Sequence, residues 1–276
     1  MLANPGSDRV RSVRRLAGRP ARERAGLFVA EGPQSVREAV AARAVTQLYA
    51  TVEAASRYEA IVAAAASSGV RARHVTPDVL AAMADTVTPQ GLLAVCRLVD
   101  VPLETVVAAR PRLVAVLARV RDPGNAGTVI RAADAAGAGA VVLTDASVDV
   151  HNPKCVRSTA GSLFHLPVVT GVPLEVAVTA LRGAGSTVYA ADGAGDVDLD
   201  DLLDAAGSGQ PGGLAGPTAW VFGNEAWGLP LADRSLADAV VRVPVHGAAA
   251  SLNLATAATV CLYASARAHR RHPPPP

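Results

Sequence analysis

The amino-acid sequence predicts an α/β protein of two domains, a small N-terminal α/β domain and a larger C-terminal domain built on a parallel sheet. Apolar strand-like segments alternate with helix-like segments along most of the chain, which is the pattern of layered α/β domains. The run LVAVLA at residues 113–118 is apolar throughout, as is typical of a parallel strand covered on both faces. Residues 100–111 contain two prolines and begin a new pattern, so we expect a linker there.

Residues 1–99 form the first predicted domain. It begins with a basic helix or arm at residues 1–25. Strands are then predicted at 26–31, 45–50, 70–75 and 91–98, and helices at 32–43 and 53–67. A further helix is expected to begin after Thr76, whose hydroxyl can cap the first turn, with Pro77 at the first helical position.

Residues 112–272 form the second predicted domain, followed by a proline-rich tail at 273–276. Strands are predicted at 113–118, 140–143, 166–169, 187–190, 219–222 and 239–245, and helices at 125–136, 153–161 and 173–182. Residues 191–217 are expected to be a loop with one helical turn at 199–205. Asn125 is predicted to cap its helix, and Ser251 is predicted to cap the last long helix.

Composition indicates a globular protein in a reducing compartment. The 276 residues are 50% hydrophobic but only 3% aromatic, so the core must be built from Ala, Val and Leu. Three cysteines, odd in number and far apart, lack the spacing of metal ligands. Because no apolar run has membrane-spanning length and the arginine-rich start has no signal-peptide core, we expect no membrane association and a cytoplasmic location.

Arginine is concentrated near the ends of the chain, although the net charge is only +2. Residues 1–24 hold seven arginines, and three more lie at 267, 270 and 271. Guanidinium groups bind phosphate oxygens well, which favours a nucleic-acid partner. A GC-rich genome that encodes Arg in place of Lys explains the same composition equally well.

Three loops of the second domain carry polar residues that a core does not need, and each follows an apolar strand. They are RDPGNAGTVIR at 121–131, GNEAWGL at 223–229, and the stretch that contains Ser251 and Asn253. Ligands of open α/β sheets bind outside the carboxyl ends of the strands, so these loops are candidates for one site. The triplets GAG at 137–139 and 183–185 lack the full G-x-G-x-x-G pattern, which argues against a nicotinamide site.

Together, three motifs resemble those of the SpoU–TrmH family of RNA ribose 2′-O-methyltransferases, within the SPOUT superfamily. The motifs are NAGTVIR (125–131), FGNEAWGL (222–229) and VPVHGAAASLN (243–253), and the resemblance covers residues 112–268 most strongly. The segments RAGLFVAEGP (24–33) and TPQGLLAV (88–95) are similar to the ribosomal-protein-like substrate-binding domain that many members carry.

The resemblance implies S-adenosyl-L-methionine as cofactor, a C-terminal trefoil knot, and a homodimer with active sites near its interface. By motif position, Gly223, Val243 and Leu252 would line the cofactor pocket, largely through backbone contacts. The polar residues expected around the reacting ribose are Asn125, Arg131, Glu225, Ser251 and Asn253. Glu225 is open to a second role, in which it holds a neighbouring loop rather than the substrate.

The implied reaction is attack of a ribose 2′-hydroxyl on a sulfonium methyl group, which requires alignment of donor and acceptor and removal of a proton. Family proposals give the base role to the position of Arg131. Because a guanidinium holds its proton tightly, orienting the hydroxyl or gripping the adjacent phosphate is the less costly role. We therefore expect Arg131 to be essential, as base, orienter or phosphate clamp.

Ribosomal RNA is the leading expected substrate, because the extra N-terminal domain favours it by analogy with the family. Transfer RNA is the alternative within the same class, and a resistance methylase acting on large-subunit RNA is a special case. A non-catalytic RNA-binding or ribosome-assembly factor on the same fold is the alternative from another class. The complete polar set at 125, 131, 225, 251 and 253 argues against a non-catalytic protein.

Overall fold

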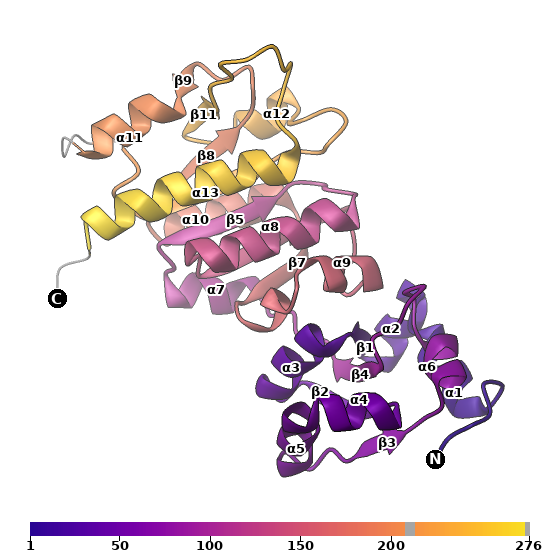
Figure 1. Cartoon of the computed structure of the whole chain (residues 1–276). Coiled ribbons are helices and arrows are strands. Elements are labelled where there is room, and N and C mark those ends of the chain that lie inside the picture. The colour runs from indigo at the N-terminus through magenta and orange to yellow at the C-terminus, as the bar shows by residue number, and fades with distance from the viewer. Residues whose placement is uncertain (208–212, 274–276) are drawn as a thin grey trace. The chain divides into compact units, whose positions relative to one another are not determined.

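The computed structural model describes residues 1–207 and 213–273, and the chain divides into two compact units (Figure 1). Unit 1 comprises Met1–Val99 together with Asp149–His165, and unit 2 comprises Asp100–Val148 and the described part of Leu166–Pro276. The α/β class predicted from the sequence is confirmed in both units.

Unit 1 is built on a mixed four-stranded sheet of order β1-β4-β2-β3. Its strands are β1 (Leu27–Glu31), β2 (Val45–Ala50), β3 (Ala72–His74) and β4 (Leu92–Arg97). Strand β4 is antiparallel to both β1 and β2, whereas β3 runs parallel to β2. Side chains alternate across the sheet, so that Val29 and Val95 face one apolar cluster while Phe28 and Cys96 are buried on the other face.

Helices cover both faces of this sheet. They are α1 (Asp8–Arg15), α2 (Arg19–Ala25), α3 (Pro33–Ala41), α4 (Val52–Arg57), α5 (Glu59–Ser67), α6 (Pro77–Met83), α9 (Pro153–Ser158) and the 3₁₀ turn η1 (Ser162–Phe164). The helix predicted at 53–67 is divided at Tyr58, whose backbone leaves the helical region (φ −114°, ψ 39°). The predicted cap is confirmed, since Thr76 accepts a hydrogen bond from the amide of Val79.

The segment 149–165 belongs to unit 1 although it follows two strands of unit 2, and this division differs from the predicted boundaries. Two contacts account for it. The Arg22 guanidinium, only 2% exposed, donates to the Asp149 carboxylate at 2.6 and 2.9 Å. The ring of Phe28 packs 4.7 Å from that of His151 and 6.0 Å from that of Phe164. Arg22, one of the arginines in the predicted basic arm, is therefore a core residue that is not available to RNA.

Unit 2 contains a seven-stranded sheet of order β7-β6-β5-β10-β8-β11-β9, and every pair in it is parallel. Its strands are β5 (Leu113–Leu117), β6 (Ala140–Thr144), β7 (Val168–Val172), β8 (Thr187–Ala191), β9 (Val197–Asp198), β10 (Thr218–Phe222) and β11 (Ala239–Arg242). The predicted parallel sheet is confirmed. Strand order reverses beside β5, because β6 pairs with one edge of it and the much later β10 with the other.

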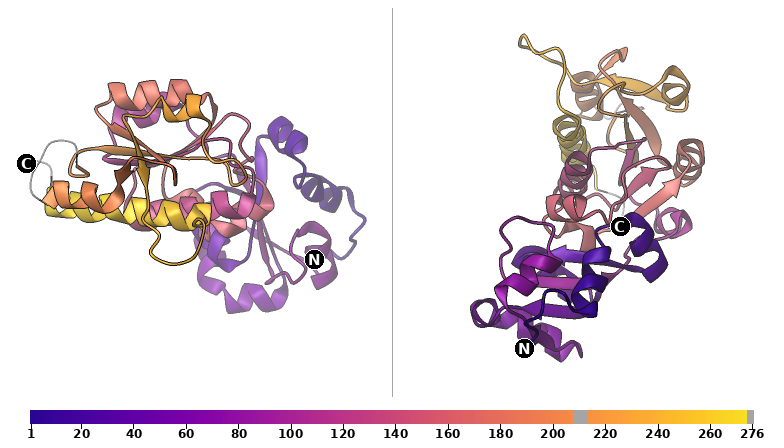
Figure 2. Two further views of the ribbon diagram at one scale, coloured as in Figure 1. Left: turned by 90° about the horizontal axis from the view of Figure 1, so that it is seen from above. Right: turned by 90° about the vertical axis from the view of Figure 1, so that its right-hand side faces the viewer.

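Helices α7 (Leu103–Ala109) and α10 (Leu174–Gly183) cover one face of this sheet (Figure 2). The other face is covered by α8 (Pro123–Ala136), α11 (Leu199–Gly207) and α13 (Leu254–Arg271), and the short α12 (Leu231–Arg234) precedes β11. Residues 100–111, expected to be a linker, instead contain α7, because Leu103 and Val106 are buried in the core of the unit.

The region 191–217, expected to be a loop with one turn, contains β9 and a helix of nine residues, α11. Part of that prediction, residues 208–212, and the tail at 274–276 lie outside the described residues. Across the described ranges, no helix combines the length and hydrophobicity needed to cross a bilayer. The trefoil knot stays a prediction.

Candidate active site at the carboxyl edge of the parallel sheet

A cleft of about 720 Å³ lies at the carboxyl edge of the sheet in unit 2, where the loops after β8, β10 and β11 meet the start of α13. Its lining includes Asp192, Gly223, Asn224, Glu225, Trp227, Arg234, Val243, Ser251 and Leu252. Parallel strands end at the same edge, which is why polar residues far apart in the sequence converge there. The volume is that of an ordinary small-molecule site.

The loop after β10 is closed upon itself. Asn224 and Gly228 exchange two backbone hydrogen bonds, at 3.0 and 2.8 Å. A Cβ on Gly223 would lie 2.4 Å from the carbonyl carbon of Gly228, so only glycine fits at this position. The buried side chain of Asn224 donates to the carbonyl of Arg119 at 2.8 Å and accepts from the amide of Ala226. The loop is therefore fixed to the segment that follows β5.

Glu225 connects the same two loops from the solvent side. Its carboxylate accepts hydrogen bonds from the amides of Arg121 and Asp122, at 3.3 and 3.1 Å. It also accepts a hydrogen bond from Nδ2 of Asn125 at 3.3 Å. These contacts match the second role considered for Glu225, in which it holds a neighbouring loop.

Asn125 lies on the third residue of α8 and does not cap it, contrary to the prediction. Asp122 is the cap, and its carboxylate accepts from the Asn125 amide at 2.7 Å. The side chain of Asn125 is thereby left for other partners. Its Nδ2 donates to Glu225, while its Oδ1 accepts a hydrogen bond from Nδ2 of Asn253 at 3.2 Å.

Asn253, not Ser251, is the cap of α13. Its Oδ1 accepts from the amides of Ala255 and Thr256, at 2.9 and 3.4 Å, and its Nδ2 is directed to Asn125. The prediction for Ser251 was wrong because the helix begins at Leu254, two residues later than a cap at Ser251 requires. Ser251 is exposed and lines the cleft, where its hydroxyl can contact a ligand.

The three residues predicted to hold the cofactor, Gly223, Val243 and Leu252, all line the cleft. Residues 244–252 make no backbone hydrogen bond to any other described residue, so their amides and carbonyls are available to a ligand. Because Gly223 has no side chain, a ligand can come close to its backbone, and the peptide groups of 244–252 can form hydrogen bonds with the same ligand. Both features suit a cofactor that is bound mainly through backbone contacts. The residues present therefore fit S-adenosylmethionine.

Arg131 lies apart from this hydrogen-bonded network, two turns into α8. Its side chain is exposed and makes no hydrogen bond or ion pair with another residue in the described part of the chain. The network of Asn125, Glu225 and Asn253 is therefore formed within one chain, and Arg131 takes no part in it.

Sequence reasoning missed several residues that shape the cleft. Arg119, in the left-handed region (φ 53°), pairs with Asp233 of α12. Arg234 donates to the carbonyl of Leu229 at 2.8 Å and lies 3.6 Å from the carboxylate of Asp192. Arg119 and Asp192 lie just after the ends of β5 and β8, a position that many surface residues share, and no local sequence signal indicates the role of Arg234.

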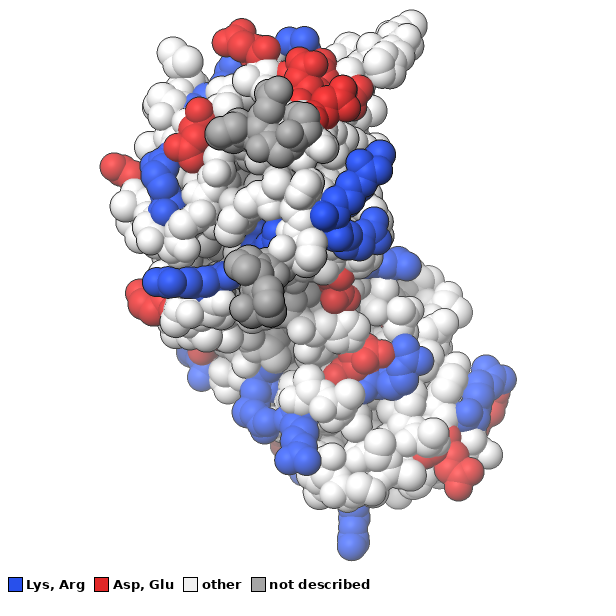
Figure 3. Space-filling view, turned by 90° about the vertical axis from the view of Figure 1, so that its left-hand side faces the viewer, with Lys and Arg blue, Asp and Glu red and all other residues white. Residues whose placement is uncertain are grey.

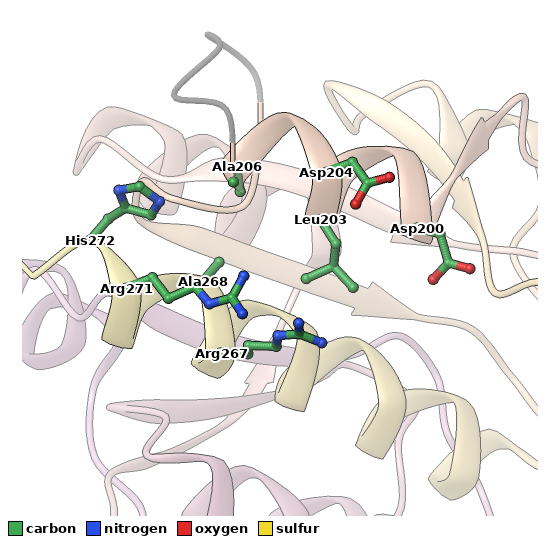
Figure 4. Close-up of a pocket in the computed structure, with 9 residues that line it drawn as sticks. Asp200, Leu203, Asp204, Ala206, Arg267, Ala268, Arg271 and His272 are labelled. Carbon is green, nitrogen blue, oxygen red and sulfur yellow. The ribbon is translucent and has the colours of Figure 1, made fainter.

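A second cavity, of about 290 Å³, lies between α11 and α13 (Figure 4). Asp200 and Asp204 line it from α11, and Arg267 and Arg271 from α13. None of the predicted site residues lies in it. Within the described ranges, no group of three His, Cys, Asp or Glu side chains could hold a metal ion, and the three cysteines are buried and form no disulfide.

Fold and site together define a two-unit α/β protein with a cleft at the carboxyl edge of its parallel sheet and an amide–carboxylate network beside that cleft. Residues 112–263 match the model of the SpoU rRNA Methylase family, and residues 7–94 match the MRM3-like substrate binding domain. The chain therefore belongs to the SpoU rRNA methylase family, which confirms the resemblance found in the sequence.

Known relatives match most of the chain. It is 31% identical over 257 residues to the 23S rRNA (guanosine(2553)-2′-O)-methyltransferase RlmP of Bacillus subtilis, covering 93% of this chain and 95% of the relative. It is 36% identical over 199 residues to a 23S rRNA (uridine(2479)-2′-O)-methyltransferase of Streptomyces viridochromogenes, covering 70% of this chain and 66% of the relative.

Solved structures agree with this assignment. The structure of the AdoMet-bound rRNA methyltransferase from Sinorhizobium meliloti superposes with a TM-score of 0.82 at 29% identity, covering 99% of this chain and 98% of that one. The SpoU methyltransferase AviRb from Streptomyces viridochromogenes, in complex with AdoMet, superposes with a TM-score of 0.80 at 32% identity, covering 95% and 97%.

Proposed function

We propose that this protein transfers a methyl group from S-adenosylmethionine to a ribose 2′-hydroxyl of ribosomal RNA. The observation that carries the proposal is the convergence of Asn125, Glu225 and Asn253, joined by hydrogen bonds at the mouth of the cofactor cleft. The family, and the Bacillus subtilis relative that is matched over 95% of its length and named as a 23S rRNA methyltransferase, support the choice of reaction and substrate.

S-adenosylmethionine, when bound, supplies an electrophilic methyl group on a positively charged sulfur. Gly223, Val243 and Leu252 would hold it in the cleft, with the free peptide groups of 244–252 as hydrogen-bond partners. Two arginines line the cleft, and both are already paired within the protein. Arg234 is turned toward Asp192 and Leu229, and Arg242 lies 3.2 Å from the carboxylate of Asp198. The negative charge of Asp192 favours a cationic cofactor.

The protein residues orient the ribose rather than react with it, and the proton that the 2′-hydroxyl loses as its oxygen takes the methyl group passes to solvent. In our proposal, Asn253 and Asn125 hold the hydroxyl-bearing edge of the sugar, and Ser251 contributes a hydroxyl from the opposite wall of the cleft. Glu225 fixes Asn125 and the backbone at 121–122. Such positioning raises the rate because the attacking oxygen and the methyl carbon must be held in line.

Arg131 completes the site in this proposal from a second copy of the chain. The surface formed by α8 and α13 exposes Val260 and Tyr263, at 39% and 46%, on a helix whose other face is buried. Exposed apolar side chains beside an arginine without a described partner are typical of an interface between subunits. We therefore infer a homodimer in which the guanidinium of Arg131 reaches the ribose or its phosphate.

Unit 1 is proposed to hold the RNA. Helix α1 buries Val10 and Val13 and exposes Arg14 and Arg15 on its other side. On the face shown in Figure 3, acidic and basic side chains are interspersed, so this face presents no single large basic field to RNA. The cytoplasm, where ribosomes are assembled, is the expected compartment, and the C-terminal segment is expected to form the knot of the family.

The test is methyl transfer from radiolabelled S-adenosylmethionine to ribosomal RNA purified from a strain that lacks the gene. We expect incorporation into this RNA and none into RNA from the parent strain, whose site is already methylated. Mapping of ribose methylation would then identify the nucleotide. Incorporation into transfer RNA alone, or cofactor binding without transfer to any RNA, would contradict the proposal.

A further inference from the structure

Trp227 is an exposed aromatic side chain at the mouth of the cleft. It is 49% exposed, whereas the other tryptophan of the chain, Trp220, is fully buried and donates to Ser265. An indole left in water at the rim of a ligand site is a large flat apolar surface available to a partner. Nothing in the proposed cofactor or ribose contacts uses this ring.

The ring is held in place and is not on a free loop. Trp227 lies inside the closed turn between Asn224 and Gly228, whose backbone hydrogen bonds fix the loop. The guanidinium carbon of Arg121 lies 5.1 Å from the centroid of the indole. An arginine stacked on an aromatic ring stabilises the orientation of both groups.

Strand order indicates which side of the cleft the ring serves. Strand β10 lies between β5 and β8, and Arg121 belongs to the loop after β5. The ring is therefore on the β5 side, where Glu225 and Asn125 also meet. Of the proposed cofactor residues, Val243 directly follows β11, on the other side of β10. The indole thus lies near the proposed ribose position rather than near the cofactor end.

We propose that Trp227, with Arg121 against its ring, forms a nucleobase subsite that stacks on the base of the nucleotide being methylated. The inference rests on the proposed function, because it requires a ribose beside Asn125. The base is attached to the sugar carbon next to the one that carries the reacting hydroxyl. A base held against the indole therefore fixes the rotation of the ribose. Because every nucleobase has a flat π-face, this subsite tolerates different bases.

The first experiment measures binding without catalysis. Tryptophan fluorescence of the wild-type protein and of Trp227→Phe is recorded with saturating S-adenosylhomocysteine while a short single-stranded oligoadenylate is added. The phenylalanine variant retains stacking but not the emission, so the difference between the two signals belongs to residue 227. We expect oligoadenylate to quench that difference and ribose 5-phosphate, which has no base, to leave it unchanged.

The second experiment measures steady-state methylation of ribosomal RNA. Trp227→Ala should lower kcat/KM for RNA about 5- to 150-fold, the range for loss of one base–aromatic stack, mainly through a higher KM. Trp227→Phe should stay within about threefold, whereas Trp227→Leu, apolar but without a π-face, should resemble alanine. Leu231→Ala is the matched control, since Leu231 is 79% exposed on the adjacent α12 but does not line the cleft.

Two results would overturn the subsite. One is quenching of the residue-227 signal by S-adenosylhomocysteine alone with no further change on adding RNA, which would assign the ring to the cofactor. The other is equal activity of the alanine, leucine and phenylalanine variants. Failure of the methyltransferase proposal looks different, since the wild-type protein would then bind oligoadenylate and methylate no RNA.

Discussion

The amide of Asn253 donates a hydrogen bond to Oδ1 of Asn125 at 3.2 Å, and 128 residues separate the two in the chain. The same Asn253 caps α13 through its Oδ1, while the same Asn125 passes the connection on to Glu225. This pair of hydrogen bonds therefore links the start of α8, the start of α13 and the loop after β10. It fixes the geometry of the proposed ribose site.

Replacing Asn253 separates its two roles. Asn253→Asp keeps an oxygen that can cap α13 but loses the amide donor, so the variant should be as stable as the wild type and much less active. Asn253→Ala should lose about 1 kcal/mol of the free energy of unfolding as well, because the cap is removed. Urea denaturation with methylation assays measures both. Equal activity of the aspartate variant and the wild type would show that the Asn125–Asn253 bond is not needed.

Gly223→Ala should abolish cofactor binding. The added methyl group would lie 2.4–2.7 Å from the backbone of Gly228 and Leu229, so the loop would have to open. Gly216→Ala, just before the same strand, is the matched control because its added Cβ meets no atom within 4 Å. Calorimetric titration with S-adenosylmethionine should show no heat for the first variant and an unchanged Kd for the second. Normal binding by Gly223→Ala would exclude the proposed cradle.

Arg131→Ala should lower methyl transfer by roughly 100- to 1,000-fold, the range for losing one group that stabilises a transition state, with cofactor affinity unchanged. Arg131→Lys should recover part of the lost activity if the positive charge alone is needed. It should recover none if the reaction requires the paired N–H donors of the planar guanidinium. Single-turnover assays at saturating RNA measure this directly. Near-normal transfer by the alanine variant would remove Arg131 from the site.

The homodimer proposal predicts complementation between two inactive variants. If Arg131 acts on the site of its partner, equal amounts of Arg131→Ala and Asn253→Asp chains, refolded together, should regain about one quarter of wild-type activity. Random pairing makes half of the dimers heterodimers of the two variants. In each heterodimer one of the two sites contains both an unchanged Arg131 and an unchanged Asn253. If both residues act within one chain, the mixture stays inactive. Sedimentation velocity of the wild type independently tests whether a dimer exists.

The Arg22–Asp149 pair predicts how stability depends on pH. Burial alone would raise the pKa of Asp149, but hydrogen bonds from His151 and Arg22 outweigh it and hold that pKa well below its usual range. A carboxyl with a lowered folded-state pKa stabilises the fold above its unfolded pKa of about 3.9, and the contribution is lost as pH falls below that value. Arg22→Ala should cost about 3–5 kcal/mol at pH 7 because it leaves a buried charge unpaired.

Thermal unfolding at pH 7 and at pH 3 measures this effect. The wild type should lose more stability than Asp149→Asn between these values, since the asparagine cannot titrate. Arg19→Ala is the control, because Arg19 is on the same helix but pairs with Glu23 at the exposed surface. Parallel stability curves for the wild type and Asp149→Asn would contradict the assignment.

The alternation of strand and helix predicted both units from the sequence, and three motifs predicted the family. These features are local or are fixed by residue type, such as the apolar run of β5, the cap at Thr76, and the Gly137 that ends α8 in the left-handed region. A glycine after a helix and a run of Leu and Val after a proline have few alternative structures in water. Such signals can therefore be read without knowing the rest of the chain.

Only the tertiary structure decided which side chains meet. No local pattern distinguishes Asp122 from Asn125 as a cap, or shows that Arg22 of a basic arm is buried against Asp149 across 127 residues. No local pattern shows that residues 149–165 belong to unit 1. Nor does any local pattern show that Asn253, and not Ser251, caps α13. Burial and pairing depend on the packing of segments distant in sequence. Residue types along the chain set the elements, but the strand order of the sheet brings together the loops that form the site.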